Sequence, residues 1–237
     1  MKPAYNRILL KISGEALAGN NGFGIDTSTA MQVASEIAQV HKSGVDIAIV
    51  IGGGNFLRGA TTEGVSRIAG DTMGMLATVI NCIAFAQHLE SFDVEAKVLS
   101  AVKIDKACEF YTPQLANDYL SKGKILLLAA GTGNPFFTTD TAAALRCAEI
   151  GADVLFKATK VDGIYDRDPV KDPDAIRFDQ ITHAEALSRN LKVMDATSFS
   201  FCMEQKIPII IFKLLEKGNL SRCIKGETIG SIIKTGG

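Results

Sequence analysis

The sequence predicts an α/β fold, a three-layer α/β/α sandwich with a mainly parallel central sheet. Apolar runs of strand length alternate along the chain with segments of helix length, as they do in repeated strand–helix units. Several of these runs are apolar at consecutive positions, which is typical of strands that helices cover on both faces. The chain has 237 residues, 47% of them apolar, so it can bury one sizeable core. We expect a single domain over residues 1–237.

Six segments are predicted to be strands, and five are predicted to be helices. The strands are residues 8–12, 46–51, 96–99, 125–130, 154–158 and 207–212. The helices are residues 26–43, 72–89, 113–122, 141–150 and 196–205. Pro113 follows Thr112 as a first-turn proline follows its cap. Residues 159–179 hold Gly163 and two Asp-Pro pairs, which predict turns or a short hairpin.

Charge and cysteine content exclude several classes of function. The chain has 25 Lys and Arg against 26 Asp and Glu, so nucleic acid is not an expected partner. Five scattered cysteines without C-x-x-C spacing indicate reduced thiols and a cytoplasmic protein. We see no leader-like segment and no apolar stretch of about 18 residues, so no membrane contact is expected. Three distant histidines predict no metal site.

Glycine-rich turns follow three of the predicted strands, at Gly14, at residues 52–55 and at residues 131–134. Ligands of open α/β sheets bind beyond the carboxyl ends of the strands. Glycine lets backbone N–H groups approach an anion closely. One such turn is weak evidence, but three together favour a phosphate-bearing ligand. The Walker A motif, the dinucleotide fingerprint and the protein-kinase motifs are absent.

Lys11 lies in an otherwise apolar strand, directly before the first glycine turn. Burying an ammonium group is costly unless an anion meets it. The alternative is a lysine at the strand edge whose side chain reaches solvent. The position before a glycine turn favours a phosphate partner.

At this point the sequence resembles the enzymes of the amino-acid kinase fold and, within them, the bacterial UMP kinases. The resemblance covers the chain nearly end to end, and its most specific part is the run GTGNPFFTTD at residues 131–140. The other matching runs are RILLKISGEAL at 7–17, IGGGN at 51–55 with Arg58 and Gly59, GDTMGMLAT at 70–78, KATKVDGIY at 157–165 and KVMD at 192–195.

The resemblance implies transfer of the γ-phosphate of ATP to UMP in pyrimidine nucleotide biosynthesis, and it implies a role for each matching residue. The implied catalytic residues are Lys11, Arg58 and Asp140. The implied ATP contacts are Lys11, Ile12, Ser13, Gly14, Gly54, Arg58, Thr159, Tyr165 and Asp168. The implied UMP contacts are Gly53, Asp71, Thr132, Gly133, Asn134, Pro135, Phe136, Phe137, Thr138 and Thr139. The acceptor side would then occupy about residues 1–150 and the ATP nucleoside side about residues 151–237.

The resemblance also implies regulation and assembly. GTP would activate and UTP would inhibit, with the effector site near Gly19, Asn20, Asn21, Gly22, Phe23 and Gly24. Between residues 73 and 86 only Thr78 and Asn81 are polar, so this helix is either buried core or part of an interface. The family forms hexamers through this region, which favours an interface and a homohexamer.

Several of these residues have a simpler interpretation. Asp71 stands where the cap of the helix at 72–89 would be, and the sequence alone favours a cap. Two interpretations of Asp140 are equally supported: it orients Lys11, or it caps the helix at 141–150. Asp195 is interpreted as a cap only. Asp168 lies in a polar segment that could simply turn, and Arg58 could be a solvated loop arginine.

The implied chemistry needs no protein base. The phosphate of UMP has a second pKa of about 6, so its oxygen is largely ionised near neutral pH. Transfer then depends on alignment and on neutralising charge, by backbone amides, Lys11, Arg58 and Mg²⁺ that ATP carries without a direct protein ligand. Two rival functions stay open: a kinase of the same fold for a carboxylate or carbamate, and a nucleotide sensor without catalysis.

Overall fold

The computed structural model describes residues 3–57, 64–191 and 193–236. The main strands are β1 (Arg7–Ile12), β2 (Asp46–Ile51), β3 (Ala96–Ser100), β4 (Glu109–Phe110), β5 (Ile125–Ala129), β6 (Val154–Thr159), β9 (Gln180–Thr182), β10 (Ile209–Lys213) and β11 (Ser231–Lys234). A separate hairpin pairs β7 (Ile164–Tyr165) with β8 (Arg177–Phe178). The helices are α1 (Gly14–Leu17), α2 (Thr27–His41), α3 (Arg67–Glu90), α4 (Pro113–Ser121), α5 (Thr139–Glu149), α6 (His183–Ser188), α7 (Ala196–Glu204) and α8 (Asn219–Ile224), with one 3₁₀ turn at Gly19–Asn21.

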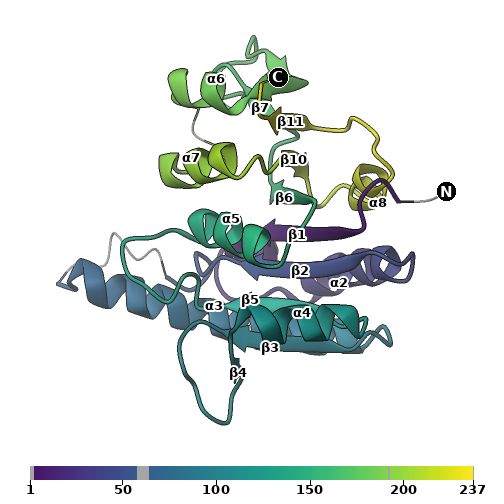
Figure 1. The fold of residues 1–237 in the computed structure, drawn as a ribbon. Helices are drawn as coiled ribbons and strands as arrows, with labels where there is room; N and C mark the ends of the chain where they lie inside the picture. The colour runs from purple at the N-terminus through teal and green to yellow at the C-terminus, as the bar shows by residue number, and fades with distance from the viewer. Residues whose placement is uncertain (1–2, 58–63, 192, 237) are drawn as a thin grey trace.

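The nine main strands form one sheet in the order β4-β3-β5-β2-β1-β6-β10-β11-β9, with helices on both faces (Figure 1). Neighbouring strands pair in parallel, except that β10 and β11 are antiparallel. The predicted three-layer sandwich with a mainly parallel sheet is therefore confirmed. All six predicted strands are present. The last begins at Ile209 rather than at residue 207 because Pro208 has no N–H to donate to the sheet.

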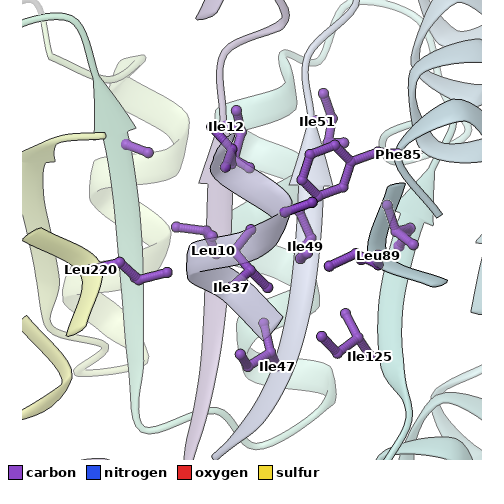
Figure 2. Packing of buried hydrophobic residues seen from close by; sticks show 14 of the residues in the cluster. Leu10, Ile12, Ile37, Ile47, Ile49, Ile51, Phe85, Leu89, Ile125 and Leu220 are labelled. Atoms are coloured by element: carbon purple, nitrogen blue, oxygen red, sulfur yellow. The ribbon is translucent and has the colours of Figure 1, made fainter. Parts of the chain in front are cut away.

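Strand side chains alternate between two apolar layers, one on each face of the sheet. Ile8, Leu10 and Ile12 pack with residues of α2, α3 and α8, and Figure 2 shows this layer closely. Leu9 faces the opposite layer, which α4, α5, α6 and α7 cover. Because side chains of a strand alternate in direction, Lys11 lies on the face of Leu9. This places its side chain on the side of α5.

Helix starts differ from the sequence prediction at two positions that matter for the site. α3 begins at Arg67, five residues before the predicted start, and the Ser66 side chain caps it by accepting from the Ala69 N–H at 3.3 Å. The interpretation of Asp71 as a helix cap is therefore wrong. α5 begins at Thr139 and is capped by Thr138. Asp140 is consequently not a cap either.

Other caps agree with the sequence. Asp195 accepts from the Ser198 N–H at 2.9 Å at the start of α7, as predicted. Thr112 accepts from the Leu115 N–H at 3.2 Å and precedes Pro113 in the first turn of α4. The predicted hairpin in residues 159–179 corresponds to β7 and β8.

The helix α3 is long and apolar along most of its length. By length and composition alone it passes the test for a membrane span, whereas the sequence was expected to hold no apolar stretch of that length. One face, which includes Cys82, Phe85 and Leu89, packs in the core. The other face leaves Ile80 and Ile83 exposed by 51% and 40%. In this structure α3 therefore buries one side and exposes the other.

Candidate active site

Two lysines and one aspartate form a buried ionic cluster at the carboxyl ends of β1 and β6. The register pairs Lys11 with Lys157 on these neighbouring strands, and α5 brings Asp140 to them in its first turn. The Lys11 Nζ lies 2.8 Å from one Asp140 carboxylate oxygen, and the Lys157 Nζ lies 2.5 Å from the other. Lys157 also donates to the Val193 carbonyl. The structure thus brings together Lys11 and Asp140 as expected, and adds Lys157.

The sequence carried a signal for Lys157 that went unused. Lys157 interrupts the apolar run of β6 just as Lys11 interrupts that of β1. The cost of burying an ammonium group applies to both. Both side chains are nearly buried, at 11% exposed for Lys11 and 10% for Lys157.

The cluster fixes its own charge state. Burial raises the pKa of Asp140, but the adjacent Lys11 and Lys157 ammonium groups lower it more, so the pKa of this carboxyl lies below its usual range. Burial lowers the pKa of the Lys157 ammonium, and although the Asp140 carboxylate opposes that shift, the net shift is downward. The Asp140 carboxyl is therefore an anion, with one lysine side chain beside each of its oxygens.

The start of α5 is held in place by side chains rather than by packing alone. Thr138 accepts from the N–H groups of Asp140 at 3.1 Å and Thr141 at 3.2 Å. Its hydroxyl donates to Asp195 at 2.5 Å, and the Thr141 hydroxyl donates to the same carboxylate at 3.0 Å. Asp195 was excluded from the site on sequence, yet it supports the residues that flank Asp140.

One pocket adjoins this cluster and contains most of the residues predicted to contact UMP. Its lining consists of Gly53, Gly54, Leu57, Gly70, Asp71, Gly74, Met75, Thr78, Gly131, Thr132, Asn134, Phe137, Thr138 and Thr139. Seven predicted UMP contacts are among them, together with Gly54 from the predicted ATP set. Gly133, Pro135 and Phe136 are not, and the Phe136 side chain is 61% exposed. We call this the acceptor pocket.

Asp71 lies on the α3 wall of the acceptor pocket. Its carboxylate accepts from the Phe136 N–H at 2.8 Å and from the Arg67 guanidinium at 2.8 Å. Burial raises the pKa of Asp71, but the hydrogen bonds from Phe136 and Arg67 lower it by more, so the net shift is downward. Phe136 has a φ of 72°, in the left-handed region. Asp71 therefore joins α3 to the loop at residues 131–139.

Two of the glycines have a packing reason that the sequence did not reveal. A Cβ at Gly14 would lie 2.3 Å from the Gly52 carbonyl oxygen, and one at Gly53 would lie 2.7 Å from the Gly74 carbonyl oxygen. The start of α1, the turn at residues 52–55 and α3 are therefore in close backbone contact. Only glycine permits this approach.

A second pocket lies on the side of β7, and we call it the nucleoside pocket. It is lined by Val161, Gly163, Ile164, Tyr165, Asp166, Arg167, Asp168, Pro169, Arg189, Asn190, Leu191 and Val193. Tyr165 and Asp168 from the predicted ATP set are among these residues. Thr159 is not, and its hydroxyl donates to the Val161 carbonyl at 2.6 Å. Asp168 also accepts from the Val170 N–H at 3.0 Å, so it shapes a turn as well.

The remaining predicted residues lie close to these pockets or outside the described residues. Ile12 and Ser13 join β1 to α1, directly after Lys11. The segment at residues 19–24 contacts the glycine turn, because Gly24 and Asn55 exchange hydrogen bonds of 2.8 and 3.0 Å. Arg58 falls outside the residues that the structure describes. Within the described residues, no group of three or more His, Cys, Asp or Glu could hold a metal ion.

Comparisons with known proteins agree on one family. The model of the "Amino acid kinase family" matches residues 6–213. The uridylate kinase of Nitrobacter hamburgensis is 50% identical over 234 residues, which is 98% of each chain. That of Methylococcus capsulatus is 49% identical over 237 residues, or 99% of each chain.

Solved structures extend this agreement to three dimensions. The UMP kinase from Bacillus anthracis superposes with a TM-score of 0.95 at 30% identity, over 98% of this chain and 97% of its own. The UMP kinase from Ureaplasma parvum gives 0.92 at 35% identity, over 97% and 99%. The chain therefore belongs to the amino acid kinase family and, within it, to the uridylate kinases.

Proposed function

We propose that this protein is a UMP kinase that transfers the γ-phosphoryl group of ATP to the phosphate of UMP, giving UDP and ADP without a protein general base. The observation that supports this proposal most directly is the position of the Lys11–Asp140–Lys157 cluster between two pockets. Asp140 directly follows Thr139 of the acceptor pocket. Lys157 donates to the carbonyl of Val193, which lines the nucleoside pocket. Two fixed cations at this junction suit a transferring phosphoryl group.

The residues of the cluster and of the glycine turns have different roles in the proposed phosphoryl transfer. A phosphate oxygen of UMP forms a new bond to the γ-phosphorus of ATP, while the bond from that phosphorus to the β,γ-bridging oxygen breaks and its electrons leave with ADP. Lys11 and Lys157 neutralise charge on the transferred group, and Asp140 holds both ammonium groups in place. Backbone N–H groups of the turns at Ser13–Gly14 and Gly53–Gly54 align the phosphates. No proton must be removed, because the acceptor oxygen is already ionised.

The Arg58 guanidinium is proposed as a further phosphate clamp, since its fork matches phosphate oxygens. Mg²⁺ would bind through the phosphates of ATP and supply additional charge neutralisation. The side chains fit this arrangement, because both Asp140 oxygens already face lysine ammonium groups. The ion would therefore need no direct ligand from Asp140.

We propose substrate contacts for residues that line the two pockets. Asp71 is proposed to accept from the UMP ribose hydroxyls, and the loop at residues 131–139 to surround the base and phosphate. Tyr165 and Asp168 are proposed to contact the ATP nucleoside. The acceptor side would then occupy about residues 1–150 and the nucleoside side about residues 151–237. What supports this division is that the two linings draw on residues 53–139 and 161–193.

Regulation, assembly and location complete the proposal. We expect a cytoplasmic homohexamer, activated by GTP and inhibited by UTP, with residues 19–24 near the effector site. The exposed apolar face of α3 supports an interface, and a charge at Ile80 or Ile83 should disrupt the assembly in light scattering. Val79 would be the wrong test position, since it is 5% exposed and packs in the core.

The direct test is a product assay with purified protein, ATP and Mg²⁺. UMP should give UDP, while N-acetylglutamate, aspartate and carbamate should give no phosphorylated product. Turnover of a carboxylate or carbamate in preference to UMP would contradict the proposal. Binding of ATP and UMP without turnover would instead indicate a nucleotide sensor.

A further inference from the structure

Thr78 and Asn81 are the two polar side chains on the otherwise apolar stretch of α3 between residues 73 and 86. They are 2% and 0% exposed, one helical turn apart on the buried face. A buried polar side chain is costly unless its hydrogen bonds are made. Their partners therefore indicate why they are there.

Asn81 contacts the turn that follows β2. Its side-chain amide donates to the Gly52 carbonyl at 2.8 Å and to the Asn55 side-chain carbonyl at 2.8 Å. The Asn55 amide donates back to Asn81 at 2.9 Å. These contacts are buried and hold both ends of the turn that presents Gly53 and Gly54 to the acceptor pocket.

Thr78 contacts the turn that follows β5. Its hydroxyl accepts from the Ala130 N–H at 2.7 Å and donates to the Met75 carbonyl at 2.7 Å. Ala130 has a φ of 61° and is followed by Gly131 at 59°. The left-handed conformation is unfavourable for alanine, so the Thr78 hydrogen bond holds a backbone that would otherwise relax.

We propose that Thr78 and Asn81 are positioning residues that together set the spacing between these two turns. Gly53 and Gly54 from the first turn and Gly131 and Thr132 from the second face the same acceptor pocket. One rigid helix that holds both turns fixes the distance across that pocket. The effect that we expect on the kinetics of UMP phosphorylation rests on the proposed function. Thr78 lines the pocket, but its hydroxyl already donates to one backbone group and accepts from another, so it acts through Ala130.

The test compares four single variants at a temperature well below their melting points. Thr78→Val keeps the shape and loses the hydroxyl, while Thr78→Ser keeps the hydroxyl. Asn81→Leu keeps the approximate volume and loses every hydrogen bond. Val79→Ala is the matched control, because Val79 is buried in the same helix and apolar. Misalignment of reacting groups costs about 10²-fold in rate when it reaches about 1 Å.

We expect Thr78→Val and Asn81→Leu to lower kcat/KM for UMP by about 10–100-fold. Thr78→Ser and Val79→Ala should stay close to wild type. Hydrogen exchange should show a faster Ala130 amide in Thr78→Val, and not in Thr78→Ser or Val79→Ala. Kinetic constants of Thr78→Val equal to those of Val79→Ala would overturn the proposal.

Failure of the positioning role and failure of the proposed function give different results in these experiments. A wild-type protein that does not phosphorylate UMP contradicts the function, and the Ala130 exchange then decides the positioning role alone. If Asn81→Leu does not fold, the Thr78→Val and Thr78→Ser pair decides it. An unchanged Ala130 exchange rate in Thr78→Val would overturn the role in either case.

Discussion

Asp140 and Asp71 both flank the acceptor pocket and both contact cations, but their surroundings differ. Asp140 lies between two lysines that are nearly buried. Asp71 pairs with Arg67, whose side chain is 50% exposed, and with one backbone N–H. Loss of Asp140 would leave two buried ammonium groups without a compensating charge. A pair with an exposed partner contributes little to stability, so its carboxylate can exchange that partner for a ligand. The first arrangement suits catalysis and the second suits substrate recognition.

The largest effect should come from Asp140→Asn. The change leaves two buried ammonium groups without an anion, which typically costs about 3–5 kcal/mol of stability. Thermal melts should show a large destabilisation, and turnover should fall in the fraction that remains folded. Asp71→Asn is the matched control and should melt close to wild type. An Asp140→Asn protein with wild-type melting temperature and turnover would contradict the role of the cluster in stability and catalysis.

Next in size are the two lysines. Lys11→Ala and Lys157→Ala should each lower kcat and kcat/KM by about 10²–10³, because each removes an oriented charge from the transferring group. Steady-state kinetics with both substrates, on protein of verified assembly, measures this. Near-wild-type turnover in either folded variant would show that the lysine in question is structural.

Asp71→Ala should produce a selective defect. It should raise the KM for UMP far more than the KM for ATP, because only the acceptor side loses a contact. Ser66→Ala should do the opposite: as the true cap of α3, its loss should cost about 1 kcal/mol of stability with both KM values intact. Equal changes in both KM values for Asp71→Ala would argue against a role in reading the ribose.

The sequence predicted those parts of the fold that a single effect determines, either the burial of a long apolar run or the cost of a charge within one. Long apolar runs identified β1, β2, β3, β5, β6 and β10, and Lys11 stood out because a charge interrupted such a run. The same reasoning applied to Lys157 and would have found it. The shorter elements escaped prediction, because β4, β9 and α6 have six residues or fewer and derive their stability from tertiary contacts.

The error at Asp71 has a specific cause. Gly70 and Asp71 look like a helix boundary, since glycine weakens helices and aspartate caps them. In the structure Gly70 is buried inside α3 and lines the acceptor pocket. The hydrogen bonds that join Thr78 to Ala130, and Asn81 to Gly52 and Asn55, could not be predicted either, because these partners are remote in sequence.

The smallest expected effect concerns a buried titratable group outside both pockets. His183 is fully buried, and its Nε2 donates to the Ile207 carbonyl at 3.0 Å. Burial lowers the pKa of His183, so the folded state favours the neutral ring. The resulting stability is present above the unfolded pKa of about 6.5 and is lost as pH falls below it. His183→Gln should reduce the loss of stability that thermal melts show as the pH falls below about 6.5. If stability depends on pH in the same way with and without the substitution, another group causes the loss.

The central claim is transfer without a protein base, and the pH dependence of kcat/KM for UMP tests it most directly. The acidic limb should follow the ionisation of the acceptor phosphate at about pH 6, because the lowered pKa of Asp140 keeps that carboxyl charged. A UMP analogue with a more acidic phosphate should move the limb downward by roughly its pKa difference, where chemistry limits the rate. A limb that stays fixed across such analogues and disappears when His41, His88 or His183 is replaced by Gln would contradict the account.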